Sequence, residues 1–183
     1  NGWKKMDINN LKQLLMESGN WSFIHQRPYG IMANPLDTPK SIFVSTAKTD
    51  PLREDYHFVL KEDQKEFQLG IDLLNRLVDQ PVFLGLDKSR PGYFESIEGV
   101  QHYSFEGPHP AGNLSLHIQK LSPLNMNDRV WTVNPEDVVN IGRFISSGVF
   151  SPQRTIAVSG NAVENPKYFK TKIGAELAPI LNK

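Results

Sequence analysis

The chain has 183 residues and a mass of 20.7 kDa, enough for a sizeable hydrophobic core, and its length predicts one domain with part of another. Lysine plus arginine number 20, as do aspartate plus glutamate, so no net basic field favours binding to nucleic acid or to an anionic membrane surface. The lack of cysteine excludes disulfides, thiol catalysis, thiolate zinc sites and cysteine-ligated iron–sulfur clusters. No apolar run approaches the roughly 20 residues of a membrane helix.

Hydrophobic periodicity divides the chain into alternating helices and strands, with one long irregular segment near the start. The first half predicts, in chain order, a helix capped by Asp7, an aromatic loop over residues 20–39, a buried strand over 41–45, a polar loop over 46–55 and a helix over 62–78. The second half predicts strands over 82–86, 100–105 and 129–133, a short helix from Asn113, and a helix that begins after Asn134 and ends at Gly148.

This alternation predicts an α/β fold with a mainly parallel sheet and helices on both of its faces. The pattern changes near residue 151, where two short strands and a helix ending at Leu181 indicate the start of a second module. We therefore expect an α/β domain over residues 1–151 and the beginning of an incomplete β-grasp-like module over residues 152–183. The abrupt start and the end just past an apolar helix predict an internal piece of a longer protein.

One turn lies where a strand is expected to lead into a helix, and its sequence is Gly107-Pro108-His109-Pro110-Ala111-Gly112. Glycine adopts backbone conformations closed to other residues, and proline fixes φ, so this turn has a defined shape. In an α/β domain such a position faces the crevice outside the carboxyl ends of the strands, where ligands usually bind. The alternative is a rigid connector without a ligand. The prolines of the turn also delete two N–H groups that a pyrophosphate would need.

Four residues near this crevice have two interpretations each. His109 either hydrogen-bonds a ligand carbonyl or hydroxyl, or bonds to the local backbone. Asp50 either supplies a carboxylate to the crevice or opens an Asp-Pro turn. Trp21 and Tyr29, in the aromatic loop, either stack on a flat ring or pack as a lid on this domain or on a partner subunit.

The signatures of several common enzyme classes are missing. The five histidines form no His-x-x-x-His or His-x-Glu pair, which argues against a metal site. No glycine-rich nucleotide loop follows a predicted strand, and Gly-x-Ser-x-Gly is absent. Hydrolase chemistry therefore has no support, and a nucleotide site lacks its usual donor loop.

A family resemblance rests on several segments that occur in the expected order along nearly the whole chain. These are Gln26-Arg27-Pro28-Tyr29-Gly30, residues 37–44, Thr49-Asp50-Pro51-Leu52, residues 107–112, Val130-Trp131-Thr132-Val133, residues 159–163 and Asn165-Pro166. With them the chain resembles the A subunit of the bacterial sodium-translocating NADH:quinone reductase. The family implies a wider kinship with the C subunit of the Rnf complex and with the FMN-carrying, NADH-oxidising subunit of respiratory complex I.

The resemblance implies that the nucleotide crevice of those relatives is vestigial here. They hold FMN with a glycine-rich loop and an acidic segment, whereas this chain has residues 20–39 and 47–51 at the same places. No cofactor is then expected on this chain: FMN, FAD, NAD and iron–sulfur clusters belong to other subunits of the complex, which are its partners. The family also implies a peripheral position on the cytoplasmic face of the bacterial inner membrane, without a membrane span, and a link to ubiquinone.

The expected function is docking to the other subunits, with ubiquinone contact as a further role, in a complex that oxidises NADH, reduces ubiquinone and exports sodium. The chain alone is expected to catalyse nothing. The residues expected to contact a quinone or a partner are His109, Gly107, Pro108, Pro110, Gly112, Trp21, Tyr29, Arg27 and Asp50. One alternative is a flavin- or nicotinamide-binding oxidoreductase domain that retained its crevice, and another is a purely structural spacer.

Overall fold

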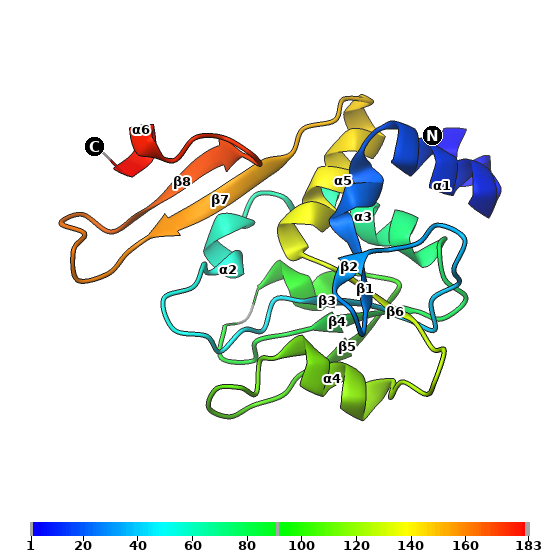
Figure 1. Ribbon diagram of the computed structural model, residues 1–183, viewed down its shortest axis with the longest axis horizontal. Coiled ribbons are helices and arrows are strands. Elements are labelled where there is room, and N and C mark those ends of the chain that lie inside the picture. The colour runs from blue at the N-terminus through cyan, green and yellow to red at the C-terminus, as the bar shows by residue number, and fades with distance from the viewer. Residues whose placement is uncertain (1, 91, 182–183) are drawn as a thin grey trace.

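The computed structural model describes residues 2–90 and 92–181, in which a two-stranded hairpin extends from a layered α/β body (Figure 1). The strands are β1 (Ile24–Arg27), β2 (Ile31–Met32), β3 (Ile42–Ser45), β4 (Val82–Gly85), β5 (Val100–Tyr103), β6 (Val130–Val133), β7 (Gln153–Val158) and β8 (Lys167–Lys172). The α-helices are α1 (Ile8–Glu17), α2 (Tyr56–Val59), α3 (Gln64–Asn75), α4 (Leu114–Leu121), α5 (Pro135–Ser147) and α6 (Ala178–Leu181). Short 3-10 helices are η1 (Gly2–Lys5), η2 (Asn20–Phe23) and η3 (Tyr93–Ser96). The outer ends of the two expected domains, residues 1 and 182–183, lie outside the described residues.

The main sheet has the strand order β2-β1-β6-β3-β4-β5. The strands β6, β3, β4 and β5 are parallel to one another, whereas β1 is antiparallel to both β6 and β2. The chain passes from β3 to β4 and β5 in one direction and then returns to β6 on the other side of β3. This reversal makes the junction of β3 and β6 a topological switch point, where the loops leaving the two strands diverge and open a crevice.

Helices cover both faces of this sheet, as the sequence predicts (Figure 1). The larger hydrophobic core packs α3 and α5 against side chains such as Ile42 and Val44. A smaller cluster packs α4 against the opposite face, where Phe43 and Val130 lie. Neighbouring residues of β3 are thus buried on opposite faces, which explains why this strand is a continuous apolar run rather than an alternating one.

The helices α3 and α5 lie directly against each other, and two glycines permit this approach. A Cβ atom at Gly70 would collide with the carbonyl oxygen of Val138, and one at Gly142 would collide with that of Glu66. Backbone therefore packs on backbone between these helices. The close packing places the start of α5 firmly beside the carboxyl end of β6.

The helix boundaries confirm Asp7, Asn134 and Gly148 as the caps that the sequence indicates. Asp7, Asn113 and Asn134 each accept a hydrogen bond from a backbone N–H in the first turn of α1, α4 and α5. Pro135 occupies the first turn of α5, where its missing N–H costs nothing. Gly148 ends α5 with φ of 74°, in the left-handed region that glycine adopts without strain.

The prediction of one long loop over residues 20–39 is wrong. The segment contains η2, β1 and β2, and β1 pairs with β6 from Ile24 opposite Val133 to Arg27 opposite Val130. With four residues in β1 and two in β2, the alternating pattern is too short to be recognised. The single turn of α2 escapes the periodicity test for the same reason.

The remaining predicted elements are present with small shifts of their ends. The long helix predicted over residues 62–78 is shorter, Gln64–Asn75, because Arg76 already caps it. The two strands expected after residue 151 form the antiparallel β7–β8 hairpin, and β7 begins at Gln153. The short helix α6 follows, as expected.

Candidate functional site

A crevice of about 600 Å³ lies at the switch point between β3 and β6. It is lined by His25, Arg27, Gly30, Ser45, Lys48, Asp50, Arg53, Gly112, Asn113, Leu114, Thr132, Val133, Asn134, Pro135, Asp137 and Arg154. The lining comes from the carboxyl ends of the two parallel strands, the loops that follow them, the start of α4 and one residue of the hairpin. This is the position at which open α/β sheets usually bind ligands.

The floor of the crevice is polar and belongs to the sheet face that carries α4. His25 of β1 lies opposite Thr132 of β6, so both side chains are on this face. Ser45 of β3 is two residues after Phe43, which packs under α4 and therefore marks the same face. The short helix α4 covers this face around Phe43 but leaves the carboxyl ends of β3 and β6 open at the crevice.

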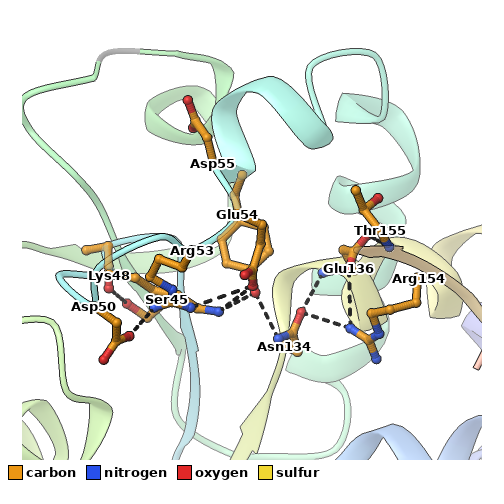
Figure 2. Close-up of polar contacts among 12 residues, drawn as sticks. Ser45, Lys48, Asp50, Arg53, Glu54, Asp55, Asn134, Glu136, Arg154 and Thr155 are labelled. Atoms are coloured by element: carbon orange, nitrogen blue, oxygen red, sulfur yellow. Dashed lines mark hydrogen bonds and ion pairs between the residues drawn. The ribbon is translucent and has the colours of Figure 1, made fainter. Parts of the chain in front are cut away.

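The loop after β3 fixes one wall of the crevice through half-buried charges. Lys48 Nζ donates to Glu54 Oε1 at 2.9 Å and also to the hydroxyl of Tyr56 (Figure 2). Burial alone would raise the pKa of Glu54, but hydrogen bonds from Lys48 and Tyr56 and the charge of Lys48 outweigh it and lower the pKa to about 2. Burial raises the pKa of the Tyr56 hydroxyl and lowers the pKa of Lys48. This wall is therefore a neutralised ion pair.

The opposite wall is the first turn of α5, which the hairpin contacts through Arg154. Arg154 Nη2 donates to Asp137 Oδ1 at 2.7 Å. Arg154 Nη1 lies 3.4 Å from Glu136 Oε2 and donates to Asn134 Oδ1 at 3.3 Å (Figure 2). The two carboxylates are buried, with 7% and 5% of their side chains exposed. Burial, with a contribution from the nearby Glu136, raises the pKa of Asp137, while Arg154 opposes the rise. The guanidinium is thus the counterion that permits both acids to be buried.

Three of the four cations that line the crevice are paired with the protein's own carboxylates. Lys48 pairs with Glu54, and Arg154 pairs with Glu136 and Asp137. The fourth cation, Arg27, has no ion-pair partner among the described residues. Arg53 pairs with Asp50 at 2.7 Å, in addition to the pairs already described. A phosphate would have to compete with these carboxylates for its cations. The lining therefore suits a neutral polar ligand better than an anion.

The turn at residues 107–112 is pinned to the loop after β3, so it does border the crevice. Gly112 lines the crevice and donates its N–H to Thr49 Oγ1 at 2.9 Å. A Cβ atom at Gly112 would lie 2.5 Å from the backbone nitrogen of Thr49, so only glycine fits this approach. His109 Nδ1 lies 3.3 Å from Thr49 Oγ1 and 3.4 Å from Asp50 Oδ1. The imidazole thus contacts a crevice residue rather than the local backbone.

Only some of the other residues expected to form a site line the crevice. Arg27 and Asp50 line the crevice together with Gly112, whereas Gly107, Pro108 and Pro110 lie on the exposed outer side of the turn. Trp21 is only 3% exposed; its indole N–H donates to Ala33 O at 2.7 Å, and its ring meets Trp131 edge-on. Tyr29 is 70% exposed under the guanidinium of Arg129. The structure brings neither ring to the crevice.

Sequence reasoning missed several crevice residues, although some carried a signal. Lys48 lies in the polar loop after a predicted strand, and the sequence indicates Asn134 only as a helix cap. His25 and Thr132 are visible as neighbours only once β1 is known to pair with β6. Arg154 comes from another part of the chain, and no local pattern indicates its position at the crevice.

Two kinds of feature are missing from the described part of the chain. Among residues 2–90 and 92–181, no three His, Cys, Asp or Glu side chains are grouped so as to hold a metal ion. In the same residues, no helix combines the length and the apolar character that crossing a membrane requires.

The fold and the site together define a class of protein. It is an α/β domain with a mostly parallel sheet, a polar crevice at the switch point, and a hairpin that supplies one wall residue. Residues 6–150 match the family described as the NqrA second alpha/beta domain, and the chain belongs to that family.

Similar curated proteins are each named as the A subunit of the Na(+)-translocating NADH-quinone reductase. The chain is 35% identical over 176 residues to the protein of Alcanivorax borkumensis and 35% identical over 172 residues to that of Pseudomonas aeruginosa. It is 31% identical over 170 residues to that of Neisseria meningitidis serogroup B. These alignments cover 95%, 94% and 93% of this chain but only 39%, 38% and 38% of the relatives. The chain thus spans about two fifths of their length.

A solved structure with a similar fold is that of an NAD+-reducing [NiFe]-hydrogenase in the air-oxidized state. The TM-score is 0.59 at 13% sequence identity, over 98% of this chain and 41% of that chain. At this identity the likeness concerns the fold alone, and it agrees with a mixed α/β architecture.

Proposed function

We propose that the chain is part of a subunit of a sodium-translocating NADH:ubiquinone reductase and that its crevice binds the ubiquinone headgroup. The observation that carries this proposal is the pairing of three cations at the crevice, Lys48, Arg53 and Arg154, with the protein's own carboxylates. A quinone is a neutral ring with two carbonyl oxygens, so it needs hydrogen-bond donors and no net charge. His25 and Thr132 on the floor are suited to donate to such carbonyls.

In this proposal the protein is a peripheral part of the membrane complex on its cytoplasmic face and holds no cofactor. NADH oxidation, flavin and iron–sulfur chemistry and sodium export belong to other subunits. Residues 1–151 form a domain related to the FMN-binding fold of the complex I subunit, and residues 152–183 begin a β-grasp module. The membership of the NqrA family supports this assignment.

Docking to partner subunits is the second part of the proposed role. The segment from Tyr29 to Leu36 exposes four large apolar side chains: Tyr29 at 70%, Ile31 at 55%, Met32 at 57% and Leu36 at 90%. The segment is held in place, because the buried Lys12 donates to the carbonyl oxygens of Pro35 and Asp37 at 2.7 and 3.1 Å. An ordered apolar segment on a surface is typical of a protein contact. We refer to residues 29–36 as the apolar segment.

Titration of a short-chain ubiquinone against the full-length protein by calorimetry tests the quinone site. Thr132→Val removes one donor with little change of shape and is expected to weaken binding about tenfold, the effect of one hydrogen bond. His109→Ala frees Asp50 and is expected to weaken binding less. Absence of binding to the unmodified protein would contradict the proposed site, and equal binding by the unmodified protein and His109→Ala would remove the role of His109.

A second candidate is a flavin or nicotinamide site in the same crevice. The volume of about 600 Å³ at the switch point is the observation that favours it. The paired cations and the absence of a glycine-rich phosphate loop argue against it. A yellow purified protein, or a rise of the unfolding temperature on addition of FMN or NADH, would establish this function in place of the quinone site.

A further inference from the structure

The β7–β8 hairpin is attached to the α/β body at two separated places. One is α5, where Arg154 of β7 binds Glu136 and Asp137 of the first turn. Gln153 of β7 also accepts hydrogen bonds there from Asn140 and Arg143. The other is Tyr168 of β8, whose ring stacks on Phe58 of α2 with 5.5 Å between the ring centroids. The Tyr168 hydroxyl also accepts a hydrogen bond from the backbone N–H of Asp55 at 3.0 Å. Figure 1 shows the hairpin reaching across from α5 toward α2.

The first of these contacts is continuous with the crevice. Arg154 itself lines the crevice and donates to Asn134 Oδ1 at 3.3 Å. Asn134 Nδ2 donates to the Tyr56 hydroxyl at 2.9 Å, and Lys48 on the far wall donates to the same hydroxyl. Figure 2 shows polar contacts that link the loop after β3, Asn134 and Arg154. The two crevice walls and the hairpin thus share one polar network.

We propose that occupation of the crevice is energetically coupled to the attachment of the hairpin, so that a bound ligand stabilises the attached hairpin and a detached hairpin weakens ligand binding. The inference rests on the proposed ligand site in the crevice. Contacts between a ligand and Arg154 exist only while the hairpin is attached. Linkage then requires that the ligand favours attachment by the same factor by which attachment favours the ligand.

Detachment of the hairpin breaks several interactions with the first turn of α5 together. If the guanidinium leaves, two carboxylates that are 7% and 5% exposed lose their counterion and repel each other. Thr155, next to Arg154, also donates its backbone N–H to Glu136 Oε1 at 2.8 Å, so the strand and the side chain leave together. Detachment of the hairpin therefore removes Arg154 from this wall of the crevice, while the first turn of α5 remains.

Tyr168→Ala tests the coupling, because Tyr168 holds the hairpin but does not line the crevice. In the full-length protein, we expect amide hydrogen exchange of β7 and β8 to rise about tenfold. Exchange at Asn134–Asp137 is expected to rise by a similar factor, and affinity for a short-chain ubiquinone to fall about fivefold. Phe58→Ala removes the same ring stack from the side of α2 and should give the same result. Lys172→Ala, an exposed change at the end of β8, is the control without effect.

The outcomes separate this inference from the proposed quinone site. If the unmodified protein binds no ubiquinone, the quinone site fails and the coupling to a quinone fails with it, whereas exchange at Asn134–Asp137 still decides whether the hairpin supports the crevice wall. The proposed coupling would be overturned if Tyr168→Ala and Phe58→Ala both speed up exchange in the hairpin but leave exchange at Asn134–Asp137 unchanged. Unchanged exchange of the hairpin itself would also overturn it, because Tyr168 would then not hold the hairpin in place.

Discussion

At the scale of single residues, the glycines between α3 and α5 determine whether the helices can meet. Gly142→Ala places a methyl group on the carbonyl oxygen of Glu66, a backbone atom that cannot rotate away. We expect a loss of at least about 2 kcal/mol of unfolding free energy, the cost of overpacking a core. Urea unfolding measures it. Gly2→Ala is the matched control, since nothing lies within 4 Å of its new Cβ, and similar losses in both variants would contradict this account.

The ion pair between Lys48 and Glu54 is expected to contribute a pH-dependent part of the unfolding free energy. The folded-state pKa of Glu54, about 2, lies below its ordinary value of 4.5, so the group adds stability above pH 4.5 that is lost as the pH falls toward 2. Lys48→Met removes the main partner of Glu54. We expect it to cost about 1–2 kcal/mol at pH 7, allowing for solvent screening, and much less near pH 3. Urea unfolding at the two pH values tests this, and a loss that is equal at both would exclude the ion pair as its cause.

At the scale of elements, the sequence predicts those whose signals are local. Asn134, Pro135 and Gly148 mark both ends of α5, and the apolar run of β3 is readable because both of its faces are buried. β1 is different, since its four residues become a strand only by pairing with β6. Tertiary pairing, rather than intrinsic propensity, decides the structure of such a short segment.

The same distinction applies to the candidate site. Asp50 and Gly112 are predictable, because each follows a predicted strand and so belongs to the carboxyl edge of the sheet. Trp21 has the composition expected of a ligand-stacking residue, but its burial against Trp131 depends on a contact between residues 110 positions apart. The position of Arg154 at the crevice cannot be predicted from the local sequence either, because it depends on where the hairpin lies.

The helix caps of α4 and α5 give a paired prediction. Asn113 caps α4 through the N–H of Ser115 at 2.9 Å, whereas Asn134 caps α5 and also joins Tyr56 to Arg154. We expect Asn113→Ala to cost about 1 kcal/mol and Asn134→Ala at least about 2 kcal/mol, because the second change also breaks buried hydrogen bonds. Thermal unfolding compares them. Asn134→Asp keeps the cap but loses the donor to Tyr56, so its cost should fall between those of the two alanine variants.

At the scale of the whole molecule, the crevice and the apolar segment are adjacent in sequence, since Arg27 and Gly30 line the crevice and Ile31 to Leu36 follow. A partner that covers the apolar segment would therefore lie beside the crevice mouth. Docking and ligand binding are then expected at one end of the domain, whereas α3, on the other face of the sheet, belongs to the core. This arrangement makes the apolar segment the place to test docking.

The double variant Ile31→Ser, Leu36→Ser tests docking without disturbing the core, because both side chains are at least half exposed. Each buried aliphatic side chain contributes about 1.5–3 kcal/mol to an interface, so retention of the protein in its complex should fall tenfold or more. Its unfolding free energy should change by less than about 0.5 kcal/mol. Met126→Ser, at a 91% exposed residue outside the apolar segment, is the matched control. Co-purification after a salt wash provides the measurement, and equal retention of all three proteins would show that partners dock elsewhere.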